Sequence, residues 1–342
     1  MKHSKKGIIA AQFNWIFILI VGVVIIAFFL TTSRHQEQNA DVELAVSFLR
    51  HLDPILSASE RSPGTLQKIS MPDMKMGFTC EDTYSKLIVG DGYEQDLTYS
   101  IIFATSVIRH RTLYTWSLDW NTPYKVAPFL YLTTPDTKFY FVNDTGSRAE
   151  TLYKGFPKNV TVEFVTSAVP RTDYGRHVFI YFSDADVQGI ANSLPGDNVY
   201  GIKITPNDPP NILGSYGKVT FTTGLGFGSP SESLYLGLPL LYGAIFSEDR
   251  EFYDCTFKKA MKRFEIANKL NKDRIKEIER RLPALDPCKP RYASPLISFA
   301  NIAGINFDDP GMDDLAKVYD GAQTLQRANE DLVRGHRCAL IY

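Results

Sequence analysis

The hydrophobic pattern divides the chain into an apolar N-terminal run, a middle of short strand-like segments and a C-terminal part with helical periodicity. From Ile8 to Leu30 no residue is charged. At about 1.5 Å per residue this run forms a helix of roughly 35 Å, and a hydrocarbon core is about 30 Å thick. The pattern predicts a transmembrane helix over residues 8–30, preceded by a cytoplasmic tail over residues 1–7.

The flanking charges predict the orientation of this helix. Lys2, Lys5 and Lys6 precede the run, whereas Arg34 is the only basic residue just after it, and positive charge collects on the cytoplasmic side. The run is also longer than the core of a cleavable signal. We therefore expect a retained signal anchor in the bilayer, with a single pass, the N-terminus in the cytoplasm and the C-terminal domain extracellular.

A second interpretation of the N-terminus is a prepilin-type processing site. Lys5 and Lys6 precede Gly7, and cleavage after Gly7 would make Ile8 the first residue and Gln12 the fifth. This start resembles type IV prepilins, in which a polar residue follows at that position. The bacterial family has Glu where this chain has Gln. The resemblance implies a pilin-like filament subunit.

Residues 31–65 are expected to form a juxtamembrane helix and linker. Apolar residues recur every three or four positions over 41–57, which predicts an amphipathic helix, and residues 57–65 break it. Two or three short strands then follow over residues 66–105.

The middle of the chain, residues 66–250, alternates strand-like and helix-like segments. Strands are expected at 113–120, 138–144, 160–165, 177–184 and 199–204, and helices at 124–132, 146–154 and 185–194. This alternation predicts an α/β ectodomain with a Rossmann-like or flavodoxin-like, mainly parallel sheet. No strand is followed by the glycine-rich turn of a dinucleotide site. A hairpin-like stretch is expected at 216–223 and 233–246.

Residues 251–342 are expected to form a helical hairpin. Apolar residues follow a strict stride over 251–282 and again over 312–334, with Asn268 and Asn271 in apolar positions of the first stride. The hairpin can pack on the rest of the chain, or its seam can mediate a homo-oligomer or bind an envelope protein, with the asparagines setting the register.

Four cysteines lie after the predicted anchor, and an oxidising exterior favours disulfides. The first long helix would separate Cys255 from Cys288 by roughly 40 Å, too far for a bond. An antiparallel second helix would return Cys338 to Cys255. The expected pairs are therefore Cys255 with Cys338 and Cys80 with Cys288.

Composition adds little about partners. Without the three N-terminal lysines, 34 basic residues face 38 acidic ones, and no basic patch alternates with aromatic residues, which argues against a nucleic-acid partner. Asn143 and Asn159 begin N-glycosylation sequons, as expected of an extracellular domain.

One set of acidic residues suggests a metal-binding site. Asp119, Asp144, Asp184 and Asp186 follow predicted strands, and ligands of open α/β sheets bind at the carboxyl ends of the strands. Convergent carboxylates there could hold Mg²⁺ for a metal-dependent hydrolase. The same residues also stand where they could cap the next helix. Trp116, Trp120 and Tyr124 could form an aromatic binding face or belong to the core.

Three segments carry a resemblance over most of the chain: QFNWIF in the predicted anchor, TWSLDWNTPYKVAPFLYLT in the middle, and YGAIF shortly before a cysteine and a long helix. With them the chain resembles a group of uncharacterised single-pass membrane proteins of small-genome archaea. The resemblance implies an archaeal cell-surface protein and assigns no reaction. The expected function is a non-catalytic binding or envelope-organising ectodomain without a cofactor, with the hydrolase and the pilin-like subunit as alternatives.

Overall fold

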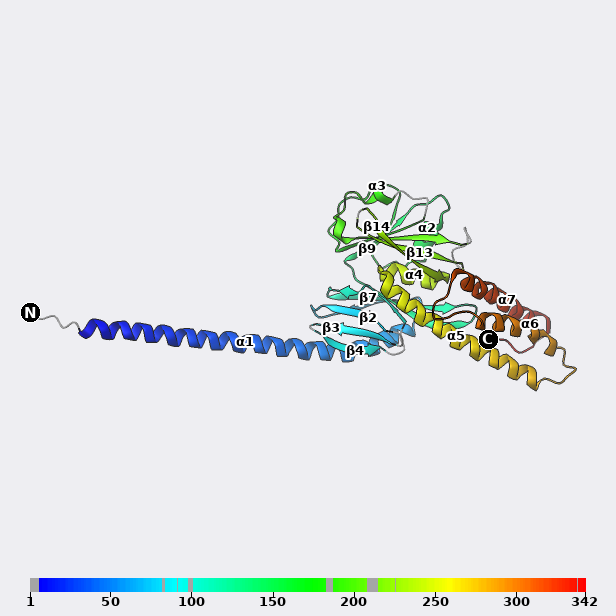
Figure 1. Cartoon of the computed structure of the whole chain (residues 1–342), viewed down its shortest axis with the longest axis horizontal. Helices are drawn as coiled ribbons and strands as arrows, with labels where there is room; N and C mark the ends of the chain where they lie inside the picture. The colour runs from blue at the N-terminus through cyan, green and yellow to red at the C-terminus, as the bar shows by residue number, and fades with distance from the viewer. Residues whose placement is uncertain are drawn as a thin grey trace, which may run out of the picture.

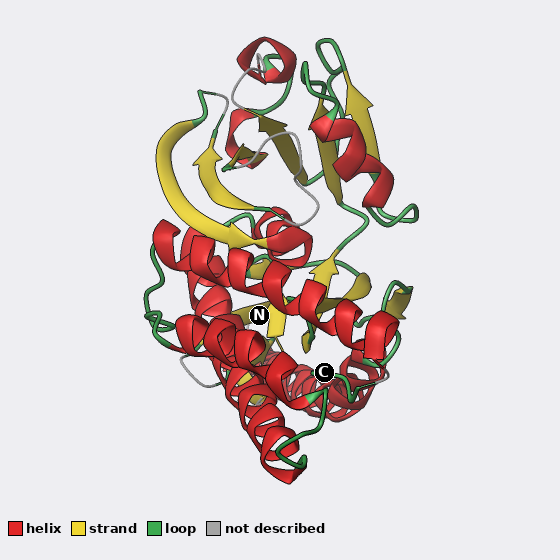
Figure 2. Cartoon of the chain, turned by 90° about the vertical axis from the view of Figure 1, so that its right-hand side faces the viewer, coloured by secondary structure: helices red, strands yellow, loops and turns green. Residues whose placement is uncertain are grey.

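The molecule is a head carried at one end of a long projecting helix (Figure 1). The computed structural model describes residues 6–81, 84–90, 92–97, 101–182, 187–207, 215–224, 226–336 and 338–342. Three sheets and the C-terminal helices form the head, and the helices lie across one side of it (Figure 2). The start of α1 lies far from the head (Figure 1).

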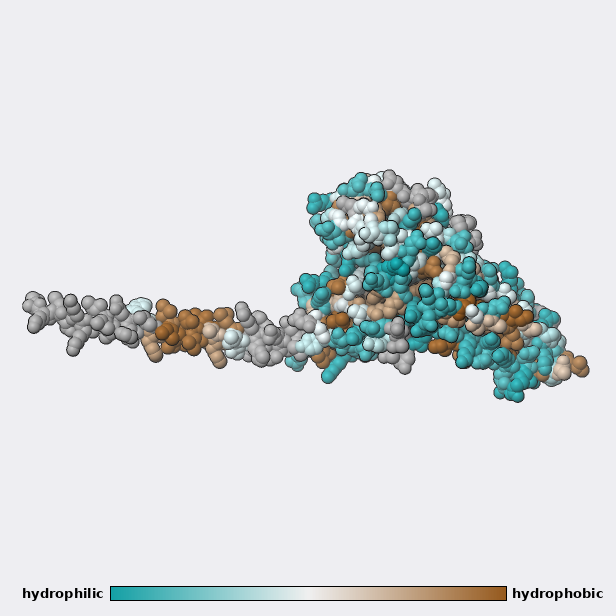
Figure 3. Space-filling view, viewed as in Figure 1, coloured by the Kyte–Doolittle hydropathy of each residue, from teal (hydrophilic) through white to brown (hydrophobic). Residues whose placement is uncertain are grey.

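Helix α1 (Lys6–Glu60) is a single helix of 55 residues. Near its C-terminal end, Leu49, Leu52 and Leu56 are buried in a core shared with the neighbouring strands. Farther toward the N-terminus its apolar side chains are exposed, and they form the hydrophobic part of the projection in Figure 3. The helix ends just before Pro63 and Gly64, and Gly64 has a φ of 78°, which suits glycine.

The transmembrane helix expected over residues 8–30 is corrected by the structure. These residues are helical, but they are part of the longer α1. Among the residues that the structure describes, none of the helices combines the length and the apolar character needed to cross a membrane. The amphipathic helix expected over 41–57 is also part of α1 and is not a separate element.

Two four-stranded sheets pack beside the C-terminal end of α1. In spatial order, the first sheet consists of β1 (Leu66–Ser70), β7 (Thr112–Asn121), β8 (Lys125–Thr133) and β5 (Ile101–Phe103). The second sheet consists of β4 (Tyr93–Leu97), β3 (Ser85–Val89), β2 (Met76–Cys80) and β6 (Val107–Ile108). All pairings in them are antiparallel except that of β5 with β8.

The helix expected over residues 124–132 is wrong, because this segment forms strand β8. The strand pairs with β7 on one side and β5 on the other. Residues 129–133 are all buried. A continuous apolar run has neither the helical nor the strand period, so its partners decide its structure.

The third sheet has six strands. In spatial order they are β10 (Val162–Val165), β9 (Thr137–Val142), β11 (Arg176–Phe182), β12 (Val199–Pro206), β13 (Tyr216–Thr223) and β14 (Gly228–Leu236). Helices α2 (Arg148–Gly155) and α3 (Val187–Ala191) lie in crossovers, and the 3₁₀ turn η1 (Gly196–Asn198) precedes β12.

The expected Rossmann-like, mainly parallel sheet is therefore wrong for the ectodomain as a whole. Strands β10, β9, β11 and β12 are parallel, as the alternation of strands and helices predicted. However, β13 and β14 add to this sheet in antiparallel fashion, and two further sheets of mostly antiparallel strands precede it. The architecture consists of mixed sheets.

Helix α4 (Gly237–Ser247) lies between the six-stranded sheet and the sheet of β7 and β8 (Figure 1). Its residues from Leu240 to Ser247 are all buried. Tyr242 and Phe246 contact the ring of Trp116 from β7. The hairpin strand expected over 233–246 is thus the end of β14 followed by a helix that connects the sheets through one core.

Three helices, and not a hairpin, form the C-terminal part: α5 (Arg250–Arg281), α6 (Ala293–Ala303) and α7 (Met312–His336), with the 3₁₀ turn η2 (Lys289–Tyr292) before α6. The side chain of Asn268 on α5 is buried, and its Nδ2 donates to the Phe299 oxygen of α6 at 3.3 Å. Asn271 donates to Ala267 of its own helix. The α5 seam packs within the chain.

All four cysteines form disulfides, as predicted, but both predicted pairs are wrong. The bonds are Cys80–Cys255 and Cys288–Cys338. Helix α6 had not been expected, and it reverses the chain once more, so α7 ends beside η2 instead of returning to the start of α5. The start of α5 instead packs against β2, which ends at Cys80. The cysteines were correctly expected to be oxidised, and both bonds are typical of an oxidising extracellular or secreted environment.

Candidate functional site

The acidic residues expected at one sheet edge are divided between two sheets. Asp119 lies in β7, which is antiparallel to both of its neighbours. Asp144 follows β9 in the six-stranded sheet. Asp184 and Asp186 lie outside the described residues. Asp119 and Asp144 do not share a carboxyl edge because their strands belong to different sheets.

Asp144 caps a helix. Its Oδ1 accepts a hydrogen bond from the Ala149 nitrogen at 2.9 Å, and its Oδ2 accepts one from the Gly146 nitrogen at 3.1 Å. The Arg148 Nε also donates to Oδ2, at 2.6 Å, and the carboxylate is fully buried. These contacts compensate the unpaired N–H groups and the positive end of α2. The arrangement is structural, as the capping alternative predicted.

Asp119 forms an ion pair with Lys125 across the β7–β8 hairpin, at 2.8 Å from carboxylate to ammonium. In the described part of the chain no group of three or more His, Cys, Asp or Glu side chains is arranged to hold a metal ion. The Mg²⁺ site remains a sequence prediction that these two aspartates do not support. The predicted processing site at Gly7, Ile8 and Gln12 lies in α1, but the side chains of Ile8 and Gln12 are outside what the structure describes.

The aromatic residues of the middle segment belong to the core. Trp116, Trp120 and Tyr124 are at most 4% exposed. His177 is also buried, and its Nδ1 lies 3.2 Å from the hydroxyl of Tyr140. Desolvation, with a further contribution from Lys138, lowers the pKa of His177 and favours its neutral form. Trp116, Trp120 and His177 contribute to packing, whereas Tyr124 is almost fully buried and also borders a depression on α5.

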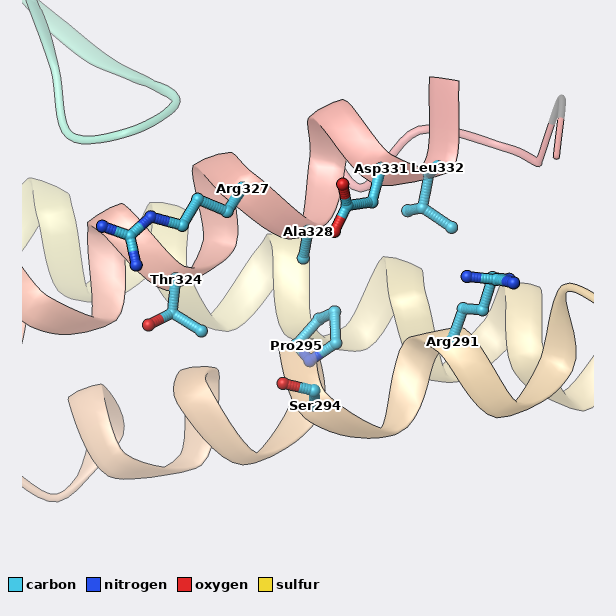
Figure 4. A pocket seen from close by; sticks show the side chains of 8 residues that line it. All are labelled: Arg291, Ser294, Pro295, Thr324, Arg327, Ala328, Asp331 and Leu332. Carbon is cyan, nitrogen blue, oxygen red and sulfur yellow. The ribbon is translucent and has the colours of Figure 1, made fainter. Parts of the chain in front are cut away.

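A cleft between α6 and α7 is a candidate for ligand binding. Its volume is about 280 Å³, and Figure 4 shows the side chains that line it. Pro295 and Ala328 face each other in the middle of the cleft. Arg291 and Arg327 lie toward opposite ends (Figure 4). The cleft therefore combines an apolar floor with a guanidinium group at each end.

The polar groups of this cleft fit a carboxylate-bearing ligand. An arginine fork can donate two parallel hydrogen bonds to a carboxylate. Arg291 and Arg327 are both exposed, and the Arg327 Nη2 donates to the Gln323 Oε1 of its own helix at 3.5 Å. Ser294 and Thr324 add hydroxyl groups to the lining, and Asp331 is its only acidic residue.

None of the residues that line this cleft was predicted as a site residue from the sequence. Thr324, Arg327, Ala328 and Asp331 follow a spacing of three and four along α7, so they share one helix face. That spacing was the feature of the sequence from which this helix face could have been predicted. Their partners Arg291, Ser294 and Pro295 come from η2 and the start of α6, where no helix was expected. The cleft forms only where α6 packs beside α7, so the sequence pattern of α7 alone could not predict it.

A second surface lies on α5. Ile266 and Leu270 are 63% and 69% exposed, and they line a depression of about 450 Å³ together with Tyr124 and Tyr342. Basic side chains border it: Lys125, Arg263 and Arg274. Aromatic and arginine side chains around exposed apolar residues are common at protein–protein contacts.

Comparison of the chain with protein-family models, with curated proteins and with solved structures finds no match.

Proposed function

We propose that this protein is a non-enzymatic, surface-located binding or envelope-organising protein, whose head lies outside the cell and is attached through helix α1 to lipid. The observation that carries the proposal is the apolar segment of α1. The side chains of Ile20, Val24 and Phe28 are between 56% and 64% exposed, whereas the far end of the same helix is buried in the head. Exposed apolar surface of this extent marks an interaction site.

Lipid is the partner that fits this segment best. The exposed apolar residues occur on all sides of the helix, since residues 23–26 are consecutive and each is exposed. These side chains can bury their apolar surface in lipid. The two disulfides support a location of the head in an oxidising compartment.

Flotation with vesicles of phosphatidylcholine and phosphatidylglycerol tests this attachment. The variant I20K/V24K/F28K places three charges on α1 with residues that favour helix, and we expect it to lose flotation. The matched control is Ile297→Lys, because Ile297 is 62% exposed but belongs to the head. Equal flotation of the triple variant and the parent protein would contradict lipid attachment through α1.

We assign the binding role to the α6–α7 cleft and expect ligands that carry carboxylates. Isothermal titration of the full chain with a tetraglutamate peptide tests this assignment. The R291A/R327A variant should lose about tenfold or more in affinity, since each charge-assisted hydrogen bond contributes about 1.5–3 kcal/mol. Arg109→Ala, which removes an exposed arginine elsewhere, should bind as the parent does. Unchanged affinity of the double variant would refute the assignment.

A pilin-like filament subunit is the second candidate. It is favoured by the continuity of α1, which projects from the head as one helix of 55 residues. In this case the apolar segments of several copies would bury one another in a helical bundle. N-terminal sequencing of the mature protein distinguishes the candidates: a chain that begins at Ile8 supports processing, and an intact Met1 excludes it.

A further inference from the structure

The six-stranded sheet has an exposed outer edge at β10. The Phe139 nitrogen of β9 donates to the Thr161 oxygen, and the Asn143 nitrogen donates to the Val165 oxygen. Because backbone groups of successive strand residues alternate in direction, Val162 and Phe164 direct theirs away from β9. Strand β10 is terminal in the sheet. Unpaired groups of this kind invite another chain to add a strand.

The composition of β10 makes this edge prone to pair with a strand of another chain. The strand reads Val-Glu-Phe-Val, and its first three residues are partly exposed. Valine and phenylalanine favour strands. Glu163, its only charged residue, is engaged by Lys138 at 2.6 Å. The strand contains no proline, which many natural edges use to prevent pairing.

Both glycosylation sequons lie at the ends of this strand. Asn159 precedes β10 by three residues, and Asn143 is joined by its backbone to Val165 at the other end. The side chains of both asparagines are exposed. The two sequons are far apart along the chain, but parallel pairing of β9 and β10 brings them to one edge.

We propose that Asn143 and Asn159 both carry N-linked oligosaccharides, and that the two glycans cover the β10 edge and prevent edge-to-edge association. A glycan is bulky and strongly hydrated. One at each end of a strand of four residues, which spans about 13 Å, leaves little room for another chain to approach. The proposal rests on the proposed extracellular location of the head and not on the ligand or lipid that the protein binds.

The modification requires a lipid-pyrophosphate-linked oligosaccharide as donor. The side-chain amide nitrogen forms a bond to C1 of the first sugar while the bond between C1 and the pyrophosphate oxygen breaks. The amide loses one proton, and lipid pyrophosphate is the leaving group. No oxidant or reductant takes part. The hydroxyl residues that the sequon demands are Thr145 and Thr161.

Glycopeptide mapping and intact mass of the full chain, secreted from a host that performs N-glycosylation, test the first part. We expect N143Q and N159Q each to remove one glycan and the double variant to remove both. The control N192Q alters an exposed asparagine outside any sequon and should change nothing. A parent protein without sugar at either asparagine would overturn the proposal.

Light scattering in a detergent that disperses α1 tests the second part. We expect the N143Q/N159Q variant to associate and the parent and N192Q to stay dispersed, with circular dichroism and disulfide mapping confirming the fold. Adding Phe164→Lys to the double variant places a charge on the edge and should restore dispersion. A double variant as dispersed as the parent, or association that persists with Phe164→Lys, would refute the shielding role.

Discussion

The Nε atom of Arg176 lies 3.7 Å from the Oε2 atom of Glu248, and the pair joins the start of β11 to the end of α4. The guanidinium also donates to the Thr105 hydroxyl at 2.7 Å and to the Val107 oxygen at 2.5 Å. One arginine thus connects the six-stranded sheet, the buried helix and the segment around β6. Glu248 is buried, and its other oxygen, Oε1, has no hydrogen-bond partner.

This pair predicts a pH dependence of stability. Burial raises the pKa of Glu248 to about 7, against the opposing effect of Arg176, whereas the ordinary value is 4.5. Between pH 4.5 and 7 the Glu248 carboxyl is therefore protonated in the folded protein and ionised in the unfolded chain. The free energy of unfolding should fall as the pH rises from about 4.5 to 7, by on the order of 3 kcal/mol, and the contribution should be constant above that range.

The variant E248Q isolates this effect. Urea denaturation at several pH values should show a smaller decrease in the free energy of unfolding between pH 5 and 7 than the parent shows. His177, whose pKa is lowered by burial, contributes in the opposite direction but equally in both proteins. Parallel stability curves for parent and variant would contradict the assignment to Glu248.

The disulfides predict two different losses of stability. Cys80 and Cys255 are 175 residues apart, and Cys288 and Cys338 are 50 residues apart. A longer loop restricts the unfolded chain more, so C80A/C255A should cost about 5 kcal/mol and C288A/C338A about 4 kcal/mol. Denaturation of both variants measures the difference. Non-reducing peptide mapping should find these two pairs, and a Cys255–Cys338 peptide would be incompatible with the three-helix arrangement.

Gly243 on α4 tests the packing of the central core. A Cβ atom at this position would lie 2.6–2.8 Å from ring atoms of Phe103, which is fully buried. Gly243→Ala should therefore destabilise the protein by about 1–2 kcal/mol, because overpacking exceeds the gain in helix propensity. At Gly311 a Cβ would meet nothing within 4 Å. A thermal unfolding midpoint as high in G243A as in the control G311A would show that the core accommodates the methyl group.

Asp249 provides a test of the first turn of α5. Its carboxylate accepts hydrogen bonds from the nitrogens of Glu251 and Phe252, each at 3.3 Å. Asp249→Ala should lower the free energy of unfolding by about 1 kcal/mol, and Asp249→Asn should largely retain it, because asparagine is an equally good cap. Chemical denaturation of both variants checks this. A loss of the same size in both would mean that charge matters here and capping does not.

Some residues of the candidate sites could be recognised from the local sequence pattern, and others could not. Asp144 could be recognised as a cap, because capping depends on residues a few positions away. The cleft of Arg291 and Arg327 could not be recognised, because its two walls are far apart in the chain.

The sequence by itself determined the local elements whose side chains have a clear period. The strides over 251–282 and 312–334 form α5 and α7 almost residue for residue, and the five strands expected between 113 and 204 all form. In α5 and α7 one face meets the core and the other meets water, so the helical period is visible in the sequence. Strands β9 and β11 are buried on both faces and appear as short apolar runs.

Only the tertiary structure decided which partner each segment takes. Residues 125–133 form a strand because β7 and β5 lie on either side of it, and the cysteines pair as they do because α6 turns the chain once more. The physical reason is that pairing order and chain reversal depend on contacts between residues far apart in sequence, and hydrophobic burial in a shared core selects among arrangements that local pattern leaves equal.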